Sequence, residues 1–161
     1  MYLPLTLPTL SLQGVSLSYL LWIRSTFSSF LGRLTTSQFC QMYIRPRTSR
    51  NHGSVTDELK LHDRFAEYVG EATWFISHTW SSVFVDTLDA IILFFQARED
   101  AVTAKVWIDL MTTSQHAHAS AGPSKSPLWW MEKFKSSIAS IGGLLLVVDC
   151  WDRPSALRRA W

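Results

Sequence analysis

The chain has 161 residues, of which 47% are hydrophobic, and it contains eight Trp and nine Phe. This composition excludes an intrinsically disordered chain and is typical of a globular protein. A chain of this length forms one domain, or one small domain with an N-terminal extension, and we favour the second arrangement. The surplus of aromatic residues also predicts a surface that meets another domain.

Charge is distributed unevenly, although the formal net charge is only +2. Residues 1–56 hold five Arg, no Lys and no acidic residue, whereas residues 57–161 hold ten basic and thirteen acidic residues. The basic residues are too sparse, and too rarely accompanied by stacking aromatics, to build the positive surface that nucleic acids require. We therefore expect no nucleic-acid partner.

The two cysteines, Cys40 and Cys150, are too few for a disulfide framework and are not spaced as metal ligands. We expect two reduced, buried thiols in a cytoplasmic protein. The longest apolar run, residues 14–23, is interrupted by Ser16 and Ser18 and is shorter than the ~20 residues of a membrane span. No membrane partner is expected.

Residues 1–50 are rich in Ser and Thr, contain Arg and lack acids, a composition that is typical of an organellar transit peptide. Against that interpretation, the first Arg is Arg24, and Pro4 and Pro8 interrupt an early amphipathic helix. We favour a helical preamble instead, and the targeting peptide stays open as an alternative.

In this preamble one helix begins after Ser16 or Ser18 and ends at Gly32, and a second short helix begins at Thr35 or Thr36. The side chains expected to point inward are Leu20, Leu21, Ile23, Phe27, Phe30, Leu31, Phe39, Met42 and Tyr43.

A polar linker is predicted over residues 45–54, where Pro46 disfavours helix at the preceding residue and Gly53 permits a turn. Residues 57–68 then predict a helix that ends before Gly70. Its apolar face consists of Leu59, Leu61, Phe65 and Tyr68.

From residue 73 onward, predicted strands and helices alternate. Residues 73–80 begin as a buried strand, and residues 81–100 form a helix. The helix carries an apolar stripe at Phe84, Leu88, Ile91, Ile92 and Phe95. Residues 105–111 predict a second strand, and residues 112–127 predict a long loop without apolar periodicity.

Residues 128–141 predict another helix, with Met131, Phe134, Ile138 and Ile141 inward. Residues 144–148 are apolar throughout, as a strand covered on both faces must be, and residues 155–161 begin a last helix. This alternation predicts a doubly wound α/β fold with a parallel sheet, in which the first strand lies between the other two. The α/β domain would span residues 66–161, after a preamble and linker in residues 1–65.

The residues and their order resemble a TIR (Toll/interleukin-1 receptor) domain. The resemblance rests on three features: residues 75–80 (FISHTW) before a helix, residues 106–109 (VWID), and a helix ending at residues 138–142 (IASIG) before residues 144–148 (LLLVV). The variant found in multidomain algal, oomycete and fungal proteins is the most similar. Its further features match Gln115-His116 and Trp129-Trp130.

The resemblance implies a three-layer, flavodoxin-like partial parallel sheet of order 2-1-3 that is truncated at its C-terminus. It also implies a signalling module that binds proteins and associates with itself. Some TIR domains cleave the glycosidic bond of NAD with a Glu in a segment that would start at Trp161 here. That Glu would lie beyond the last residue, so the resemblance assigns no catalytic residue in this chain.

Polar side chains at the carboxyl ends of the first two predicted strands define a candidate ligand pocket, because open parallel sheets bind ligands there. Ser77, His78 and Trp80 lie at the end of the first strand, and Asp109 lies at the end of the second. Neighbouring strand residues face opposite ways, so Ser77 and His78 are not a nucleophile pair, and we expect Asp109 to bond the following loop. Arg158, in the last helix, is a candidate for phosphate contact.

Neither a metal nor a phosphate loop is expected. His116 and His118 lie two residues apart in the predicted loop and lack a third ligand nearby. Gly142 and Gly143 precede a strand, which is the wrong context for a phosphate loop. The first hypothesis is thus a TIR-like interaction module that binds no cofactor. The alternative is an NAD-cleaving hydrolase, with NAD as its substrate, that uses a Glu outside this chain.

Overall fold

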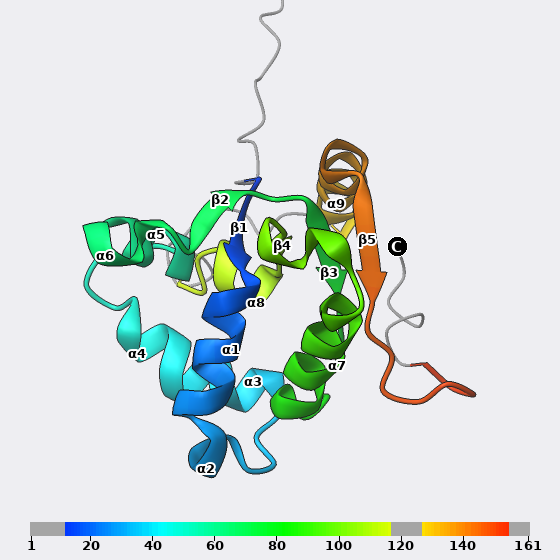
Figure 1. Cartoon of the computed structure of the whole chain (residues 1–161), viewed down its shortest axis with the longest axis horizontal. Coiled ribbons are helices and arrows are strands. Elements are labelled where there is room, and N and C mark those ends of the chain that lie inside the picture. Colours follow the sequence, from blue (N-terminus) through cyan, green and yellow to red (C-terminus); the bar gives the residue numbers. More distant parts are fainter. Residues whose placement is uncertain (1–11, 117–126, 155–161) are drawn as a thin grey trace, which may run out of the picture.

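The computed structural model describes residues 12–116 and 127–154, and these form a mixed α/β structure around one sheet (Figure 1). The sheet has the strand order β2-β1-β4-β3-β5. Its strands are β1 (Gln13–Ser16), β2 (Val69–Glu71), β3 (Trp74–Ser77), β4 (Lys105–Trp107) and β5 (Gly143–Leu146).

Strand β3 lies between β4 and β5 and is parallel to both, as the alternation of strands and helices predicted. Phe75 is the partner of Trp107 on one side and of Leu144 on the other. The prediction that the sheet has only these three strands is wrong, however, because β1 pairs antiparallel with both β2 and β4. The N-terminal segment therefore contributes a strand as well as helices.

Gly14 explains how β1 fits into this position. A Cβ atom on Gly14 would lie 2.7 Å from the backbone oxygen of Val106, which is closer than side chains approach backbone atoms. Only glycine allows β1 to approach β4 so closely.

Short helices fill the segment between β1 and β2. They are α1 (Leu17–Thr26), α2 (Ser28–Leu31), α3 (Thr36–Phe39), the π-helix η1 (Cys40–Ile44), α4 (Arg45–Arg47), α5 (Val55–Lys60) and α6 (Asp63–Ala66). The predicted caps are present: the Ser16 hydroxyl accepts from the Tyr19 amide, and Thr35 forms a capping box with Gln38.

Several predictions for this segment are wrong. Leu21 and Phe30, expected inward, are 44% and 48% exposed, and the helix expected to end at Gly32 is divided into α1 and α2. Pro46 does not stop the helix: Ile44 and Arg45 keep helical backbone angles, and α4 continues directly from η1 through Pro46. The expected helix over residues 57–68 is divided into α5 and α6, and Leu61, next to the break, is 66% exposed. Met42, expected inward, is 52% exposed because a π-helix rotates the side chains away from the 3.6-residue period.

The later elements are α7 (Phe84–Gln96), the 3-10 helix η2 (Glu99–Val102), α8 (Asp109–Thr112) and α9 (Pro127–Ile141). The apolar stripe of α7 is confirmed, since all five of its predicted residues are buried. The strand predicted over residues 105–111 ends at Trp107, and residues 109–111 of that prediction belong to α8 instead.

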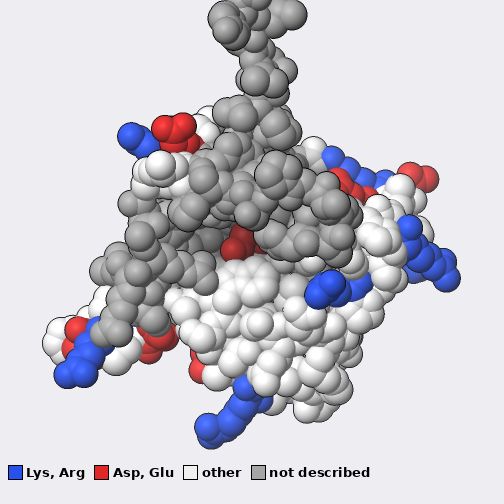
Figure 2. Space-filling view, turned by 180° about the vertical axis from the view of Figure 1, so that it is seen from behind, with Lys and Arg blue, Asp and Glu red and all other residues white. Residues whose placement is uncertain are grey.

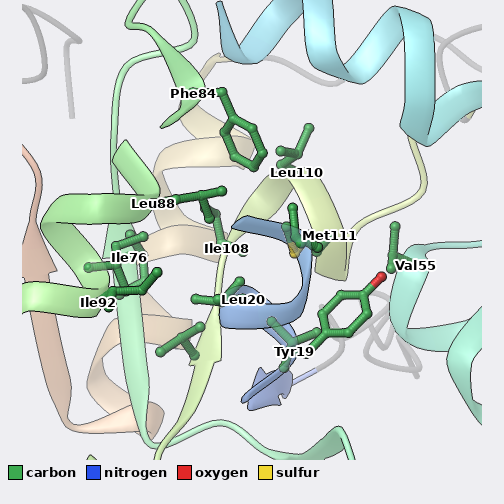
Figure 3. Close-up of a cluster of buried hydrophobic side chains, with 14 of the residues drawn as sticks. Tyr19, Leu20, Val55, Ile76, Phe84, Leu88, Ile92, Ile108, Leu110 and Met111 are labelled. Atoms are coloured by element: carbon green, nitrogen blue, oxygen red, sulfur yellow. The ribbon is translucent and has the colours of Figure 1, made fainter. Parts of the chain in front are cut away.

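The core is divided between the two faces of the sheet. The larger cluster joins α1, α5, α7 and α8 to one face, and Figure 3 shows its side chains converging from both halves of the sequence. On the other face, Phe75 and Trp107 stack with their ring centroids 4.5 Å apart and contact Phe134, Ile138 and Ile141 of α9. The sheet is thus covered by helices on both sides.

Strand β5 is the edge of the sheet, and the prediction that both of its faces are buried is wrong. Leu144 is 49% exposed and Val148 is 44% exposed, because the edge position leaves side chains that α9 does not reach. Cys150 is also exposed, against the expectation of two buried thiols, while Cys40 is buried. None of the described helices combines the length and hydropathy needed to cross a membrane.

Candidate functional site

The candidate site lies where β3 and β4 end side by side. His78 and Trp80 follow β3 directly, and Asp109 is the first residue of α8, two residues after β4. Because the two strands are parallel, these segments leave the sheet at the same edge. The fold therefore brings together three of the five residues that the sequence proposed.

Asp109 is the centre of this group. Its Oδ2 accepts from the indole Nε1 of Trp80 at 2.8 Å, and its Oδ1 accepts from the Leu110 amide at 2.7 Å. The carboxylate is 22% exposed. The expected bond to the following segment is present, and both carboxylate oxygens are occupied.

His78 approaches the same carboxylate without a hydrogen bond to it. Its Nδ1 lies 3.8 Å from Asp109 Oδ1, beyond hydrogen-bond range, and its side chain is only 1% exposed. The imidazole lies beside the Trp80 indole, with centroids 6.5 Å apart and planes inclined by 24°.

The neighbours of His78 differ in their hydrogen bonding. Ser77 is buried, and its backbone oxygen accepts from the Val147 amide at 2.8 Å, which joins β5 to the site. Thr79 is also buried, and its hydroxyl has no hydrogen-bond partner among the described residues. A buried hydroxyl without a partner is costly, so the Thr79 hydroxyl could bind a further partner without losing a bond to a described residue.

Gln115 stabilises α8, which carries Asp109, and the sequence did not reveal this role. Its Nε2 donates to the backbone oxygens of Asp109 at 2.9 Å and of Thr113 at 3.1 Å. Its Oε1 lies 3.8 Å from the thiol of Cys40 in η1. The amide thereby satisfies carbonyl groups at the end of a one-turn helix and connects α8 to the N-terminal helices.

Cys40 is not an activated nucleophile. Burial, together with the negative charge of Asp109 and against the opposing effect of Arg45, raises the pKa of the Cys40 thiol from 9.0 to about 11. A thiol with that pKa is almost entirely protonated at neutral pH, and only the thiolate reacts.

A second polar group also escaped prediction, because its members are far apart in the sequence. His116 Nε2 lies 2.8 Å from the hydroxyl of Thr48, which already donates to the Ile44 oxygen, so the histidine is the donor. Its ring centroid lies 5.0 Å from that of His52. Burial first, then the charges of His52 and Arg45, lower the pKa of His116, which favours the neutral imidazole.

Several predicted residues fall outside the description. Arg158 and His118, and the helix expected over residues 155–161, lie outside the described residues, as do the side chains of Trp129 and Trp130. Within residues 12–116 and 127–154, no group of three or more His, Cys, Asp or Glu side chains is placed to hold a metal ion.

In comparisons with known proteins, no family model, no curated protein and no solved structure matches this chain.

Proposed function

We propose that this chain is a TIR-like protein-interaction module that has no catalytic activity of its own and associates with itself. The motif residues around Ser77 and Asp109 support the family, and the parallel strands β4-β3-β5 are compatible with the flavodoxin-like order 2-1-3 of such a domain. The fold alone hosts many functions, so the argument for interaction depends on the surface.

The observation that carries the proposal is an apolar surface on the N-terminal helices. Four large side chains there are more than a third exposed: Leu21, Trp22, Phe30 and Met42. The rings of Trp22 and Phe30 are joined through two further rings, because Trp22 contacts Phe27 and both Phe27 and Phe30 contact Tyr43. Exposed apolar side chains that adjoin one another are typical of protein-binding surfaces.

Charge supports the same conclusion. On the face of the molecule opposite to that in Figure 1, Figure 2 shows the Lys and Arg side chains of the described residues separated from one another. A nucleic-acid site would gather basic side chains into one patch. We therefore propose a protein partner and no nucleic-acid partner.

The polar site argues against catalysis by this chain alone. Both oxygens of Asp109 are occupied by donors from the same protein, and His78 is nearly inaccessible. A general base must reach the proton that it removes, and the burial of His78 limits that reach. These contacts instead stabilise the ends of β3 and β4.

One observation favours the alternative, an NAD-cleaving hydrolase. Thr79 has a buried hydroxyl without a partner among the described residues, at the sheet edge where open α/β sheets bind ligands. In that alternative, Thr79, His78 and Asp109 would line the pocket, and the catalytic Glu would come from outside this chain.

Two measurements on the 161-residue protein test the proposal. Sedimentation velocity over a series of concentrations should show reversible association, and incubation with NAD should yield no nicotinamide above the buffer control. A Phe30→Glu variant with Leu93→Glu as its control, a leucine 69% exposed on α7, reports whether the helical surface contributes. Nicotinamide release by the wild-type protein would overturn the proposal in favour of the hydrolase.

A further inference from the structure

Two side chains in the segment after α8 attach it to the N-terminal helices. The Ser114 hydroxyl donates to the backbone oxygen of His52 at 2.6 Å, and the His116 Nε2 lies 2.8 Å from the Thr48 hydroxyl. Thr48 is fully buried and follows α4 directly. The partners are 62 and 68 residues apart in the sequence, so the two bonds fix how this segment lies against the helices.

The surroundings of the His116 ring disfavour a positive charge. The residue is only 9% exposed, so little water can hydrate a charged imidazole. The His52 ring lies 5.0 Å away, centroid to centroid, and the guanidinium of Arg45 in α4 adds a permanent positive charge. Burial first, then the charges of His52 and Arg45, lower the pKa of His116, and a hydrogen bond with the Arg45 backbone opposes them only in part.

Acidic side chains on the neighbouring elements do not compensate in the part of the chain that the structure describes. Asp109 of α8 accepts from the Trp80 indole, and in α5, which contacts α8, Asp57 and Glu58 bond to residues of their own segment. Residues 117–126, which follow the histidine, contain no Asp or Glu. A proton on this ring would therefore add charge to a buried place whose charged neighbours are positive.

The backbone of His52 adds a second reason for this contact to open. Its φ angle is 52°, in the left-handed region that residues other than glycine rarely adopt. The Ser114 bond to the His52 oxygen helps to hold that conformation. Once the segment after α8 leaves, the turn that follows α4 can relax.

We propose that His116 is a pH-sensitive latch, which holds residues 114–116 against the N-terminal helices when it is neutral and releases them on acidification. The released segment would bind a proton with the ordinary histidine pKa of 6.5, whereas the latched ring has a lowered pKa. The latch is therefore complete above pH 6.5 and weakens as the pH falls below that value. It depends on an internal contact and not on the proposed function.

Amide hydrogen exchange followed by NMR tests the latch. The reporters are the amides of Thr48 and His52, which donate to the oxygens of Ile44 and Thr48 in the turn that the latch covers. Between about pH 7.5 and about pH 5, where Asp and Glu side chains stay ionised, the wild-type protection factors should fall by about fivefold or more.

His116→Gln is the decisive variant, because glutamine keeps a side-chain N–H for the Thr48 hydroxyl but gains no proton in this range. Its protection factors should stay constant. His62→Gln is the matched control, since His62 is an exposed histidine, and it should show the wild-type fall. His52→Gln removes one positive neighbour of the ring and should show a smaller fall than the wild-type protein.

The outcomes separate the latch from a general effect of acid. Wild-type protection that does not change with pH would overturn the proposal, as would a His116→Gln protein that loses protection as the wild-type protein does. If His116→Gln does not fold by circular dichroism, the NMR titration of the His116 imidazole in the wild-type protein decides. A pKa below 6.5 would support the latch, and a pKa at or above 6.5 would overturn it.

Discussion

At the scale of single residues, the contact between Trp80 and Asp109 is the bond that joins the ends of β3 and β4. The indole N–H donates to a carboxylate that is mostly buried, and a bond to a charged acceptor is stronger than one between neutral groups. Removal of the indole N–H leaves one carboxylate oxygen without a donor. Most of the loss in stability comes from leaving this buried acceptor unsatisfied.

Trp80→Phe should therefore lower the free energy of unfolding by about 1–3 kcal/mol. Urea denaturation followed by circular dichroism measures this change. Trp151→Phe, at a position 89% exposed, is the control and should leave the midpoint almost unchanged. Equal effects of the two substitutions would show that the Asp109 bond contributes nothing specific.

The Cys40 thiol provides a pH-dependent prediction. Its pKa is raised from 9.0 to about 11, so the folded state holds the proton more tightly than the unfolded state does. The stabilisation is complete below pH 9 and is lost as the pH rises toward 11. Wild-type stability should fall more steeply over this window than that of Cys40→Ala, measured by urea denaturation at pH 8, 9 and 10.

Chemical labelling of the thiols tests the raised pKa of Cys40 in a second way. At neutral pH, iodoacetamide should modify the exposed Cys150 and spare the buried Cys40, as peptide mass spectrometry can resolve. Fast labelling of Cys40 under native conditions would contradict the raised pKa.

None of these contacts could be predicted from the sequence, although several of their residues could. The sequence placed Trp80 and Asp109 at strand ends, but 29 residues separate them, and only the parallel register brings them together. Gln115, Thr48 and His116 were missed as site residues because a polar side chain in a loop or short helix has no periodicity that reveals its partner.

At the scale of secondary-structure elements, periodicity decided what could be predicted. Helix α7 has 13 residues and repeats its apolar stripe three times, so its presence and its buried face were predictable, whereas the predicted bounds, residues 81–100, were too wide at both ends. Strands β1 and β2 have four and three residues and contain Gly14 and Gly70, too little for an alternating pattern to appear. The exposure of β5 was missed because an apolar run does not reveal whether its strand lies at an edge.

The central strand β3 yields a prediction about folding. Ile76 is 2% exposed in its middle, so Ile76→Asp would bury an unpaired charge and should cost more than about 4 kcal/mol, enough to prevent folding. Circular dichroism and the soluble yield measure this. Leu93→Asp on the exposed side of α7 should fold normally, whereas a folded, soluble Ile76→Asp protein would refute the assignment of β3.

The unexpected pairing of β1 with β4 can be tested through two glycines that are partners in the register. Gly14→Ala places a methyl group 2.7 Å from the Val106 backbone oxygen and should destabilise the fold by about 1–3 kcal/mol. Gly70→Ala meets only side-chain atoms of Lys105, the nearest at 3.1 Å, which can shift, and should cost less than about 1 kcal/mol. Thermal unfolding of both variants compares them, and equal stabilities would contradict the close approach of β1 to β4.

At the scale of the whole molecule, the N-terminal segment and the strands that follow it share one sheet and one core. Val15 and Leu20 pack in the same cluster as Ile76 and Ile108, so the helices before β2 bury the face of the sheet that α7 leaves uncovered (Figure 3). The alternation of strands and helices revealed the parallel part of this sheet. Its antiparallel extension depends on contacts between segments about 90 residues apart, which a local pattern does not encode.

Among its described residues, the molecule combines a polar site, whose carboxylate accepts bonds from the same chain, with an exposed apolar surface on the N-terminal helices. This contrast is the reason for proposing an interaction module over an enzyme. Sedimentation equilibrium of the wild-type protein from low to high micromolar concentrations is the most direct test. The account predicts a reversible rise from the mass of one chain to that of two, and a mass of one chain at every concentration would contradict it.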